Sequence, residues 1–366
     1  MKFLFDFYTQ TDLVILYFFY LAFIFSIVFY YPKISLKISG EEYDSVQRIH
    51  KDKEEIPRMG GLAVFIGLVA CLFINVEIDS WLNQELKPIF ILLILCNIPL
   101  FFISLKEDIK FNVSPIKRLI AILASSFLFI YFQPFGLPSI ELPYVGNFLN
   151  APVVSIIFFT IAHAGYCNGM NLIDGSNGLA GMVIFTTLLS IGFLSFMLSD
   201  LTILYVCLIL MAFIVIFLLF NYPWGSIFLG DSGAYLWGSI LASLTIILYS
   251  KHDIPSWAAL VILFYPSIEM VFSYIRKKIQ NRNPLHPDPD HMHLKLFFVI
   301  ENSVHSPRIS NCLVMPMISI IWLTPALIIP WVFDEAILAI LSFILLTIIY
   351  FGFYWALPEK INLKKR

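Results

Sequence analysis

Amide and carboxylate side chains are concentrated between two apolar runs that are each long enough to cross a bilayer. The stretch reads Asn171-Leu-Ile-Asp174-Gly-Ser-Asn177-Gly-Leu-Ala-Gly181. Such side chains are costly at a membrane unless they meet water, a metal or a polar ligand. The three polar positions share a face if the local turn is helical. We interpret the stretch as a nucleotide and metal site, the alternative being an ordinary glycine-rich loop between helices.

Two acidic segments follow the same pattern of carboxylates at the ends of apolar runs. Glu107 and Asp108 are adjacent at the end of one run, and their mutual repulsion favours a bound cation or proton. The alternative is a solvated helix end. Asp231 lies between Gly230 and Gly233 at the start of another run, where it can also serve as a helix cap. Because its segment has no Lys or Arg to pair with this carboxylate, we predict that Asp231 binds a metal ion.

A basic segment rich in histidine begins at Arg276-Lys277-Lys278 and continues to His293. Its imidazoles and carboxylates resemble zinc ligands, but the further Cys or His of a zinc motif is absent. Imidazole surrounded by Lys and Arg is better suited to phosphate. Arg118 and the cations of 50–61 could also meet phosphate or simply mark the inner side of the membrane. Acids for Mg²⁺ beside cations for phosphates predict phosphoryl transfer on a pyrophosphate.

Composition predicts that these segments belong to a membrane protein. The chain has 366 residues, of which 59% are hydrophobic and 13% charged, whereas soluble domains have roughly 25% charged residues. The deficit extends along the whole length, so an all-α polytopic protein is expected. No nucleic-acid partner is expected. The five cysteines are single and form no Cys-x-x-Cys pair, which argues against a disulfide framework.

Eleven apolar runs are suited to transmembrane helices of ~20 residues. They lie at 12–31, 59–76, 88–105, 117–133, 152–168, 180–198, 201–220, 234–249, 256–275, 309–330 and 335–356.

The positions of Lys and Arg predict the orientation. With the N-terminus outside and the C-terminus in the cytoplasm, only Lys2, Lys87 and Lys251 of the 23 basic residues lie outside, as the positive-inside rule requires. We predict one domain over 1–366. Its active-site loops then all face the cytoplasm, at about 32–58, 106–118, 169–179, 221–233 and 276–308.

With these residues in hand, the chain resembles the polyprenyl-phosphate N-acetylhexosamine-1-phosphate transferase superfamily. Its members include phospho-N-acetylmuramoyl-pentapeptide transferase and the GlcNAc-1-phosphate transferases that start O-antigen or teichoic-acid synthesis. Five segments between about His50 and His293 match in family order. They are Pro57-Arg-Met-Gly-Gly61, Glu107-Asp108, Asn171–Gly181, Asn221 with Phe228-Leu-Gly-Asp231, and Pro287-Asp-Pro-Asp-His-Met-His293.

The resemblance implies a multi-pass enzyme of the bacterial cytoplasmic membrane. It would move a sugar 1-phosphate from a UDP-HexNAc onto undecaprenyl phosphate, release UMP and need Mg²⁺, with Mn²⁺ as a substitute. A homodimer is expected from the resemblance alone. By the same matching, the catalytic residues are Glu107, Asp108 and Asp231, and the metal ligands are Asp231 and Asp174. The substrate-binding residues are Asn171, Asp174, Asn177, Asn221, Arg118, His291, His293 and Lys53.

Three departures from the family pattern guide the choice of branch. Glu107 replaces the first Asp, Asn177 stands where many members have a second Asp, and Leu294 follows where a further His is common. The Pro-Asp-x-x-His form and eleven spans favour a GlcNAc-1-phosphate transferase over the pentapeptide enzyme, which stays the alternative. A transporter, the alternative of another class, predicts acids within spans and two related halves. Here the acids lie at inner helix ends and no repeat is visible. Direct transfer and a covalent two-step route through Glu107 or Asp108 both stay open.

Overall fold

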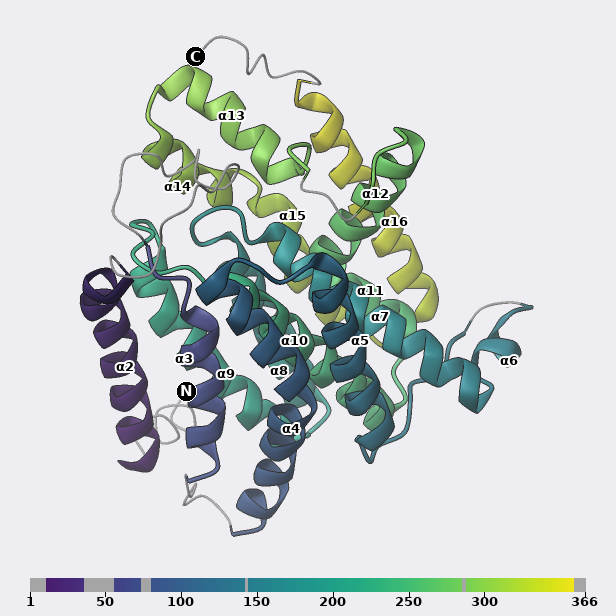
Figure 1. Ribbon diagram of the computed structural model, residues 1–366. Coiled ribbons are helices and arrows are strands. Elements are labelled where there is room, and N and C mark those ends of the chain that lie inside the picture. Colours follow the sequence, from purple (N-terminus) through teal and green to yellow (C-terminus); the bar gives the residue numbers. More distant parts are fainter. Residues whose placement is uncertain (1–10, 36–55, 74–79, 142–143, 285–287, 359–366) are drawn as a thin grey trace.

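The described part of the chain is built from helices alone. The computed structural model describes residues 11–35, 56–73, 80–141, 144–284 and 288–358, and no strand occurs in these ranges. Nine helices there are long and apolar enough to cross a membrane, and one bent pair makes a tenth. Figure 1 shows them side by side as a bundle, with α13 (Met292–Val304) across one end. The chain is therefore an all-α polytopic membrane protein, as the sequence predicts.

Eight helices are uninterrupted spans. They are α2 (Thr11–Ser35), α4 (Ser80–Lys110), α5 (Pro115–Phe132), α7 (Pro152–Ile173), α8 (Leu179–Met197), α9 (Leu201–Asn221), α10 (Gly230–His252) and α16 (Ala336–Ala356). The remaining helices are shorter. Besides α13 they are α3 (Gly60–Cys71), α6 (Gly146–Leu149), α11 (Ser256–Ile262), α12 (Phe264–Ile279), α14 (Pro307–Met317), α15 (Ser319–Ile328) and the 3-10 turn η2 (Ile329–Trp331).

Each of the eleven expected runs contains helix within the described residues, but not all are simple spans. The run at 256–275 is divided into α11 and α12, which meet at an angle of 88°. The last three short elements together form one span, Pro307–Trp331. The run at 59–76 contains α3, which has only 12 residues and is shorter than a bilayer requires. The orientation of the two termini stays a prediction.

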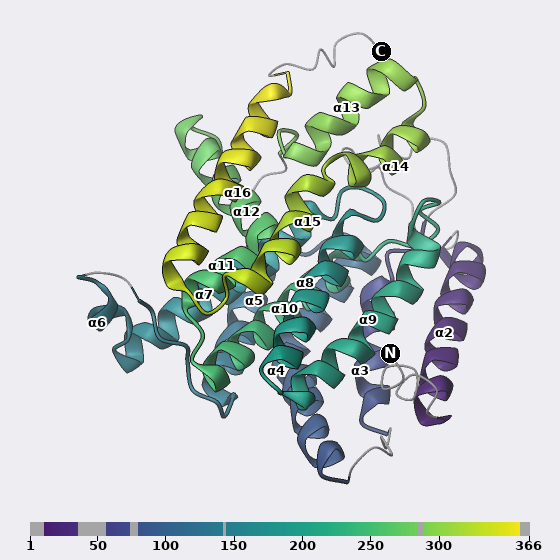
Figure 2. The ribbon, with the colours of Figure 1, turned by 180° about the vertical axis from the view of Figure 1, so that it is seen from behind.

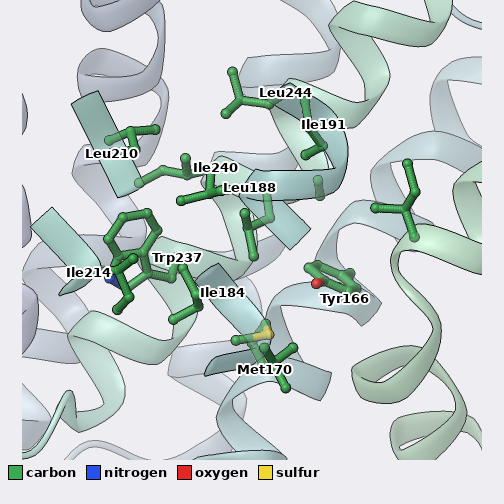
Figure 3. Close-up of a cluster of buried hydrophobic side chains, with 14 of the residues drawn as sticks. Tyr166, Met170, Ile184, Leu188, Ile191, Leu210, Ile214, Trp237, Ile240 and Leu244 are labelled. Carbon is green, nitrogen blue, oxygen red and sulfur yellow. The ribbon is translucent and has the colours of Figure 1, made fainter. Parts of the chain in front are cut away.

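Helix α10 is the centre of the bundle. Every residue from Gly230 to Tyr249 is buried, and α3, α4, α7 and α8 pack against it. Figure 3 shows Trp237, Ile240 and Leu244 of α10 within a cluster of apolar side chains from its neighbours. A helix without a separate polar face is expected to be buried on all sides, and the apolar run of α10 has no such face. Its first turn is therefore fixed in place by the helices around it.

The outer helices face the lipid. Large apolar side chains such as Phe18 of α2 and Ile348 of α16 are exposed, as expected where hydrocarbon and not water surrounds the protein. Seen from behind, α8 and α9 lie side by side, and so do α15 and α16 (Figure 2). The polar residues singled out in the sequence gather at the end of the bundle that α13 covers.

Candidate active site

Asp108 fixes the start of α10. Its Oδ1 accepts a hydrogen bond from the backbone N–H of Asp231 at 2.7 Å, and its Oδ2 accepts from Ser232 N at 2.8 Å and Ser232 Oγ at 2.6 Å. The first N–H groups of a helix lack partners within the helix and carry partial positive charge. A carboxylate from the end of α4 therefore caps α10. Gly230 makes this approach possible, since its φ is +71° and a Cβ would stand 2.7 Å from Asp108 Oδ1.

Asp231 lies between two arginines. Its Oδ1 accepts from Arg58 Nη2 at 3.1 Å, and its Oδ2 accepts from Arg118 Nη1 in a close ion pair. The Arg58 Nε also lies 3.6 Å from Asp108 Oδ1. The two arginine side chains are 27% and 22% exposed, whereas Asp231 is nearly buried. The site thus joins a fixed carboxylate to two cations that solvent, and hence a phosphate, can reach.

Arg58 is placed by backbone pairing before α3. Phe228 N donates to Pro57 O at 2.9 Å, and Gly60 N donates to Phe228 O at 3.0 Å. The start of α3 then packs so tightly on α10 that a Cβ at Gly61 would overlap Gly233 N. The sequence left the role of Arg58 open, because a basic residue before a span is also a topology signal. In the structure the motif Pro57–Gly61 positions the guanidinium of Arg58 beside Asp231.

The adjacent acids of α4 do not act as a pair. Consecutive residues on a helix point in different directions, and Glu107 turns away from Asp108. Its Oε2 accepts from Val113 N at 2.7 Å, and its Oε1 lies 3.9 Å from Arg118 Nη1. Glu107 therefore shapes the turn between α4 and α5 and orients Arg118. The prediction that Glu107 is catalytic is not tested by this geometry.

Asp174 ends α7 and faces the other acids. Burial raises the pKa of Asp174 well above its usual range, and the carboxylates of Asp231 and Asp108 raise it further while Arg58 acts against them. None of the described residues donates a hydrogen bond to this carboxylate. One turn earlier, Asn171 Nδ2 donates to the hydroxyl of Tyr235 on α10 at 3.0 Å. Of the carboxylates in the cluster, Asp174 is the one without a positive partner in direct contact among the residues that the structure describes.

Asn177 and Asn221 join the loops around the site. Asn177 Nδ2 donates to Pro223 O at 3.1 Å, and Asn221 Oδ1 accepts from Gly178 N at 2.7 Å. Asn177 N donates to the side chain of Asn311 on α14 at 2.6 Å. The contact with Asn311 was not foreseen, because a lone amide far along the chain carries no signal by itself. The substrate contacts predicted for Asn177 and Asn221 stay predictions.

The histidine loop reaches the same place from α13. His293 is buried, and a Cβ on Gly175 would overlap its Nε2. Burial, and then the neighbouring His291, lower the pKa of His293 to about 3, so its ring is neutral at neutral pH. Within the described residues its buried Nδ1 has no hydrogen-bond partner. The ring of His291 is parallel to that of His293 at 5.9 Å between centroids. Lys53 lies outside the described residues.

The residues present suit a divalent cation in part. No three His, Cys, Asp or Glu side chains in the described ranges are grouped closely enough to hold a metal by themselves. Asp231 and Asp174 nevertheless supply hard oxygen donors. Burial, and after it the carboxylates of Asp231 and Asp108, raise the pKa of Asp174, and a nearby cation would favour its charged form. Mg²⁺ is typically held by one or two carboxylates together with substrate phosphates and water. Two carboxylates therefore fit a metal that arrives with its nucleotide.

Known proteins are similar to this chain over most of its length. Residues 90–249 match the family model described as glycosyl transferase family 4. Phospho-N-acetylmuramoyl-pentapeptide-transferase of Streptococcus pneumoniae (strain Hungary19A-6) is 24% identical over 68% of this chain and 78% of its own length. The protein of that name from Streptococcus thermophilus (strain CNRZ 1066) is 25% identical over 73% and 81%. Undecaprenyl-phosphate alpha-N-acetylglucosaminyl 1-phosphate transferase of Thermotoga maritima is 28% identical over 65% and 67%.

These matches and the site define a membrane enzyme that transfers a sugar phosphate. The match to glycosyl transferase family 4 and the names of the relatives support the polyprenyl-phosphate sugar-1-phosphate transferase superfamily for this chain. The resemblance found from five short segments is thereby confirmed at the level of the superfamily.

Proposed function

We propose that this enzyme transfers a HexNAc-1-phosphate, with GlcNAc-1-phosphate as first choice, from a UDP-sugar to undecaprenyl phosphate. The products are UMP and an undecaprenyl-diphospho-sugar, which begins a cell-envelope glycan. The observation that carries the proposal is that Asp231, beside Asp174, pairs with both Arg58, at 3.1 Å, and Arg118. Acids for a metal and cations for phosphate meet at one point. The names of the relatives supply the kind of group transferred, and one of them names undecaprenyl phosphate; the UDP carrier is what the resemblance implies.

In this proposal Asp231 and Asp174 hold Mg²⁺, or Mn²⁺ in its place. A metal held there would supply positive charge for the donor pyrophosphate. Arg58 and Arg118 are partly exposed, so they can turn from Asp231 toward phosphate oxygens as substrate enters. Electrostatic stabilisation and positioning supply most of the catalysis in phosphoryl transfer.

We also propose direct attack by the lipid phosphate on the sugar-bearing phosphorus. The covalent route needs a carboxylate free to attack. Both oxygens of Asp108 accept hydrogen bonds from the start of α10, and Glu107 is bonded to Val113. A carboxylate already serving as a helix cap is a poor nucleophile, because attack would cost it these donors. The direct route leaves the cap intact.

We also propose that the enzyme lies in the bacterial cytoplasmic membrane with its active site toward the cytoplasm. Support comes from the basic residues, which lie almost entirely in segments on the site's side of the predicted topology. The proposed donor, a UDP-sugar, is found in the cytoplasm, so this orientation lets the donor reach the active site. The homodimer expected from the resemblance stays a prediction.

Replacing Asp231 tests the proposal. Purified enzyme is given UDP-GlcNAc, undecaprenyl phosphate and Mg²⁺, and UMP release and the lipid product are measured. Wild type is expected to form both, and Asp231→Asn is expected to lose Mg²⁺-dependent transfer while remaining inserted. Asp334→Asn, at an exposed position before α16, is the matched control. Near-normal turnover by Asp231→Asn would refute the metal assignment.

A second candidate function is favoured by two of the relatives described above. Phospho-N-acetylmuramoyl-pentapeptide-transferases match this chain at 24–25% identity, close to the 28% of the GlcNAc-1-phosphate enzyme. A donor panel that includes UDP-MurNAc-pentapeptide and several UDP-HexNAc sugars separates the two. Turnover with the pentapeptide donor alone would replace the first proposal, and no UMP release from any donor would refute both.

A further inference from the structure

A buried carboxylate on α12 contacts the histidine loop. Glu269 is fully buried. Its Oε1 accepts from His291 Nδ1 at 2.9 Å and from Met292 N at 3.2 Å, and its Oε2 accepts from the Tyr350 hydroxyl at 2.7 Å. A buried carboxylate is costly unless donors surround it, and here two other elements, the start of α13 and α16, supply them. Glu269 thus joins α12, α13 and α16 at one point.

The contact with Glu269 determines the protonation of the His291 ring. A carboxylate only accepts hydrogen bonds, so Nδ1 of His291 carries a proton. In the neutral ring Nε2 is then the acceptor, and none of the described residues bonds to it. Carboxylates behind a functional histidine fix its tautomer and its orientation. His291 is therefore held as a ring with one defined nitrogen left for a ligand.

The His291 ring is continuous with the acidic site. It lies parallel to the ring of His293, with an angle of 8° between the planes. His293 in turn touches Gly175, the residue after Asp174. A displacement of the first ring would therefore be passed to the second ring and to the loop that carries Asp174.

A second buried carboxylate shows what simple anchoring of the same loop looks like. Asp288 Oδ2 accepts from Arg276 Nη2 at 2.5 Å and from Ser273 Oγ at 3.1 Å, both on α12. Burial acts to raise the pKa of Asp288, but Arg276 and then His291 hold it below its usual value. Asp288 makes no hydrogen bond to a histidine among the described residues. The loop is already tied to α12 without Glu269.

We propose that Glu269 is a positioning residue for the transfer reaction. It holds His291 by Nδ1–H so that the acceptor Nε2 faces a hydroxyl or N–H donor of the bound nucleotide sugar, and Tyr350 holds Glu269 by its second oxygen. This inference rests on the proposed function, since it assigns a nucleotide-sugar contact to the same site.

The test compares Glu269→Gln with Asp288→Asn and with His291→Gln, alone and combined. Gln keeps the shape and an acceptor oxygen but loses the charge. We expect Glu269→Gln to lower kcat about 10–100-fold, as loss of a partner behind a functional histidine does, with a smaller change in KM. Glu269→Gln combined with His291→Gln should be no worse than His291→Gln alone. Asp288→Asn should lower thermal stability. Any reduction of kcat that it causes should multiply with the reduction caused by His291→Gln in the double variant.

Each outcome decides between the proposals. If wild type is active and the reductions of kcat caused by Glu269→Gln and His291→Gln multiply in the double variant, the positioning role is overturned and the proposed function is kept. Normal turnover by Glu269→Gln would do the same. Absence of transfer by wild type with every donor refutes the proposed function and the positioning role with it. If Glu269→Gln does not accumulate in membranes, Tyr350→Phe removes only one donor hydroxyl, and its few-fold loss should also vanish in the His291→Gln background.

Discussion

Replacement of Asp108 by Asn separates a helix cap from a nucleophile. The amide keeps one acceptor oxygen, which can still receive the N–H of Asp231, but its NH₂ group faces the N–H of Ser232 and leaves that donor buried without a partner. An unsatisfied buried donor costs about 1–3 kcal/mol, and loss of the charge weakens the remaining bonds. Together with the helix-dipole contribution of about 0.3–1 kcal/mol, the change should destabilise the start of α10 by about 1–4 kcal/mol.

The cost falls on Asp231, which occupies the first turn of α10. Asp108→Asn is therefore expected to lower the apparent melting temperature in detergent, raise the Mg²⁺ concentration needed for half-maximal rate and retain measurable transfer. The assays are thermal unfolding, Mg²⁺ titration of UMP release, and UMP exchange into UDP-GlcNAc with no lipid acceptor present. Direct attack predicts no exchange in wild type.

Two results would refute this reasoning. One is an Asp108→Asn enzyme that is as stable as wild type and completely inactive. The other is exchange of UMP in the absence of lipid that disappears in the variant. Both would assign Asp108 as a covalent nucleophile, and the hydrogen bonds to α10 would then be incidental.

Two further predictions follow from the same end of the bundle. Gly61→Ala places a Cβ against Gly233 N and should push α3 from α10, with a loss of about 1–3 kcal/mol and of activity. Gly352→Ala, where a Cβ meets nothing within 4 Å, should be neutral in the same thermal assay, and equal behaviour of the two variants would contradict the packing argument. Because the pKa of Asp174 is raised in the absence of metal, its protonated fraction grows as pH falls through this raised range, and Mg²⁺ affinity should fall with it. The Mg²⁺ titration repeated across acidic pH measures this, and a pH-independent affinity in wild type, or an unchanged pH dependence in Asp174→Asn, would contradict it.

The sequence predicts the fold well where one physical signal dominates. Long apolar runs mark helices because backbone groups in lipid must be satisfied within the helix, and each of the eleven expected runs contains helix within the described residues. The break between α11 and α12 was not predicted, since an apolar run looks the same whether the helix is straight or bent. For the same reason, the sequence did not predict that α3 has only 12 residues.

The site was only partly predictable for a different reason. Asp108, Asp231 and Asp174 were chosen individually, and the structure brings them within electrostatic range of one another. The sequence could not show that Asp108 caps the helix bearing Asp231, because that bond joins residues 123 positions apart. Arg58 was hidden among basic residues that also serve as topology signals.

Glu269 was missed although a signal existed. The expectation that acids lie only at inner helix ends is wrong for this residue, which lies within the apolar run at 256–275 and is fully buried in α12. A carboxylate inside an apolar run is a functional-site hypothesis by default. Weighing that single residue would have pointed to α12 as a support for the histidine loop.

The hydrogen bond between Asn177 and Asn311 has a consequence for biogenesis. A membrane protein emerges from the ribosome from its N-terminus, so α4, α7 and α10 can insert, and Asp108 can cap α10, well before residue 311 is made. The loop at Asn177 receives its acceptor on α14 only afterwards, and His293 reaches Gly175 late in synthesis for the same reason. A nascent chain thus holds the acidic cluster before it holds a finished nucleotide loop, and the last third of translation is the step that completes the enzyme.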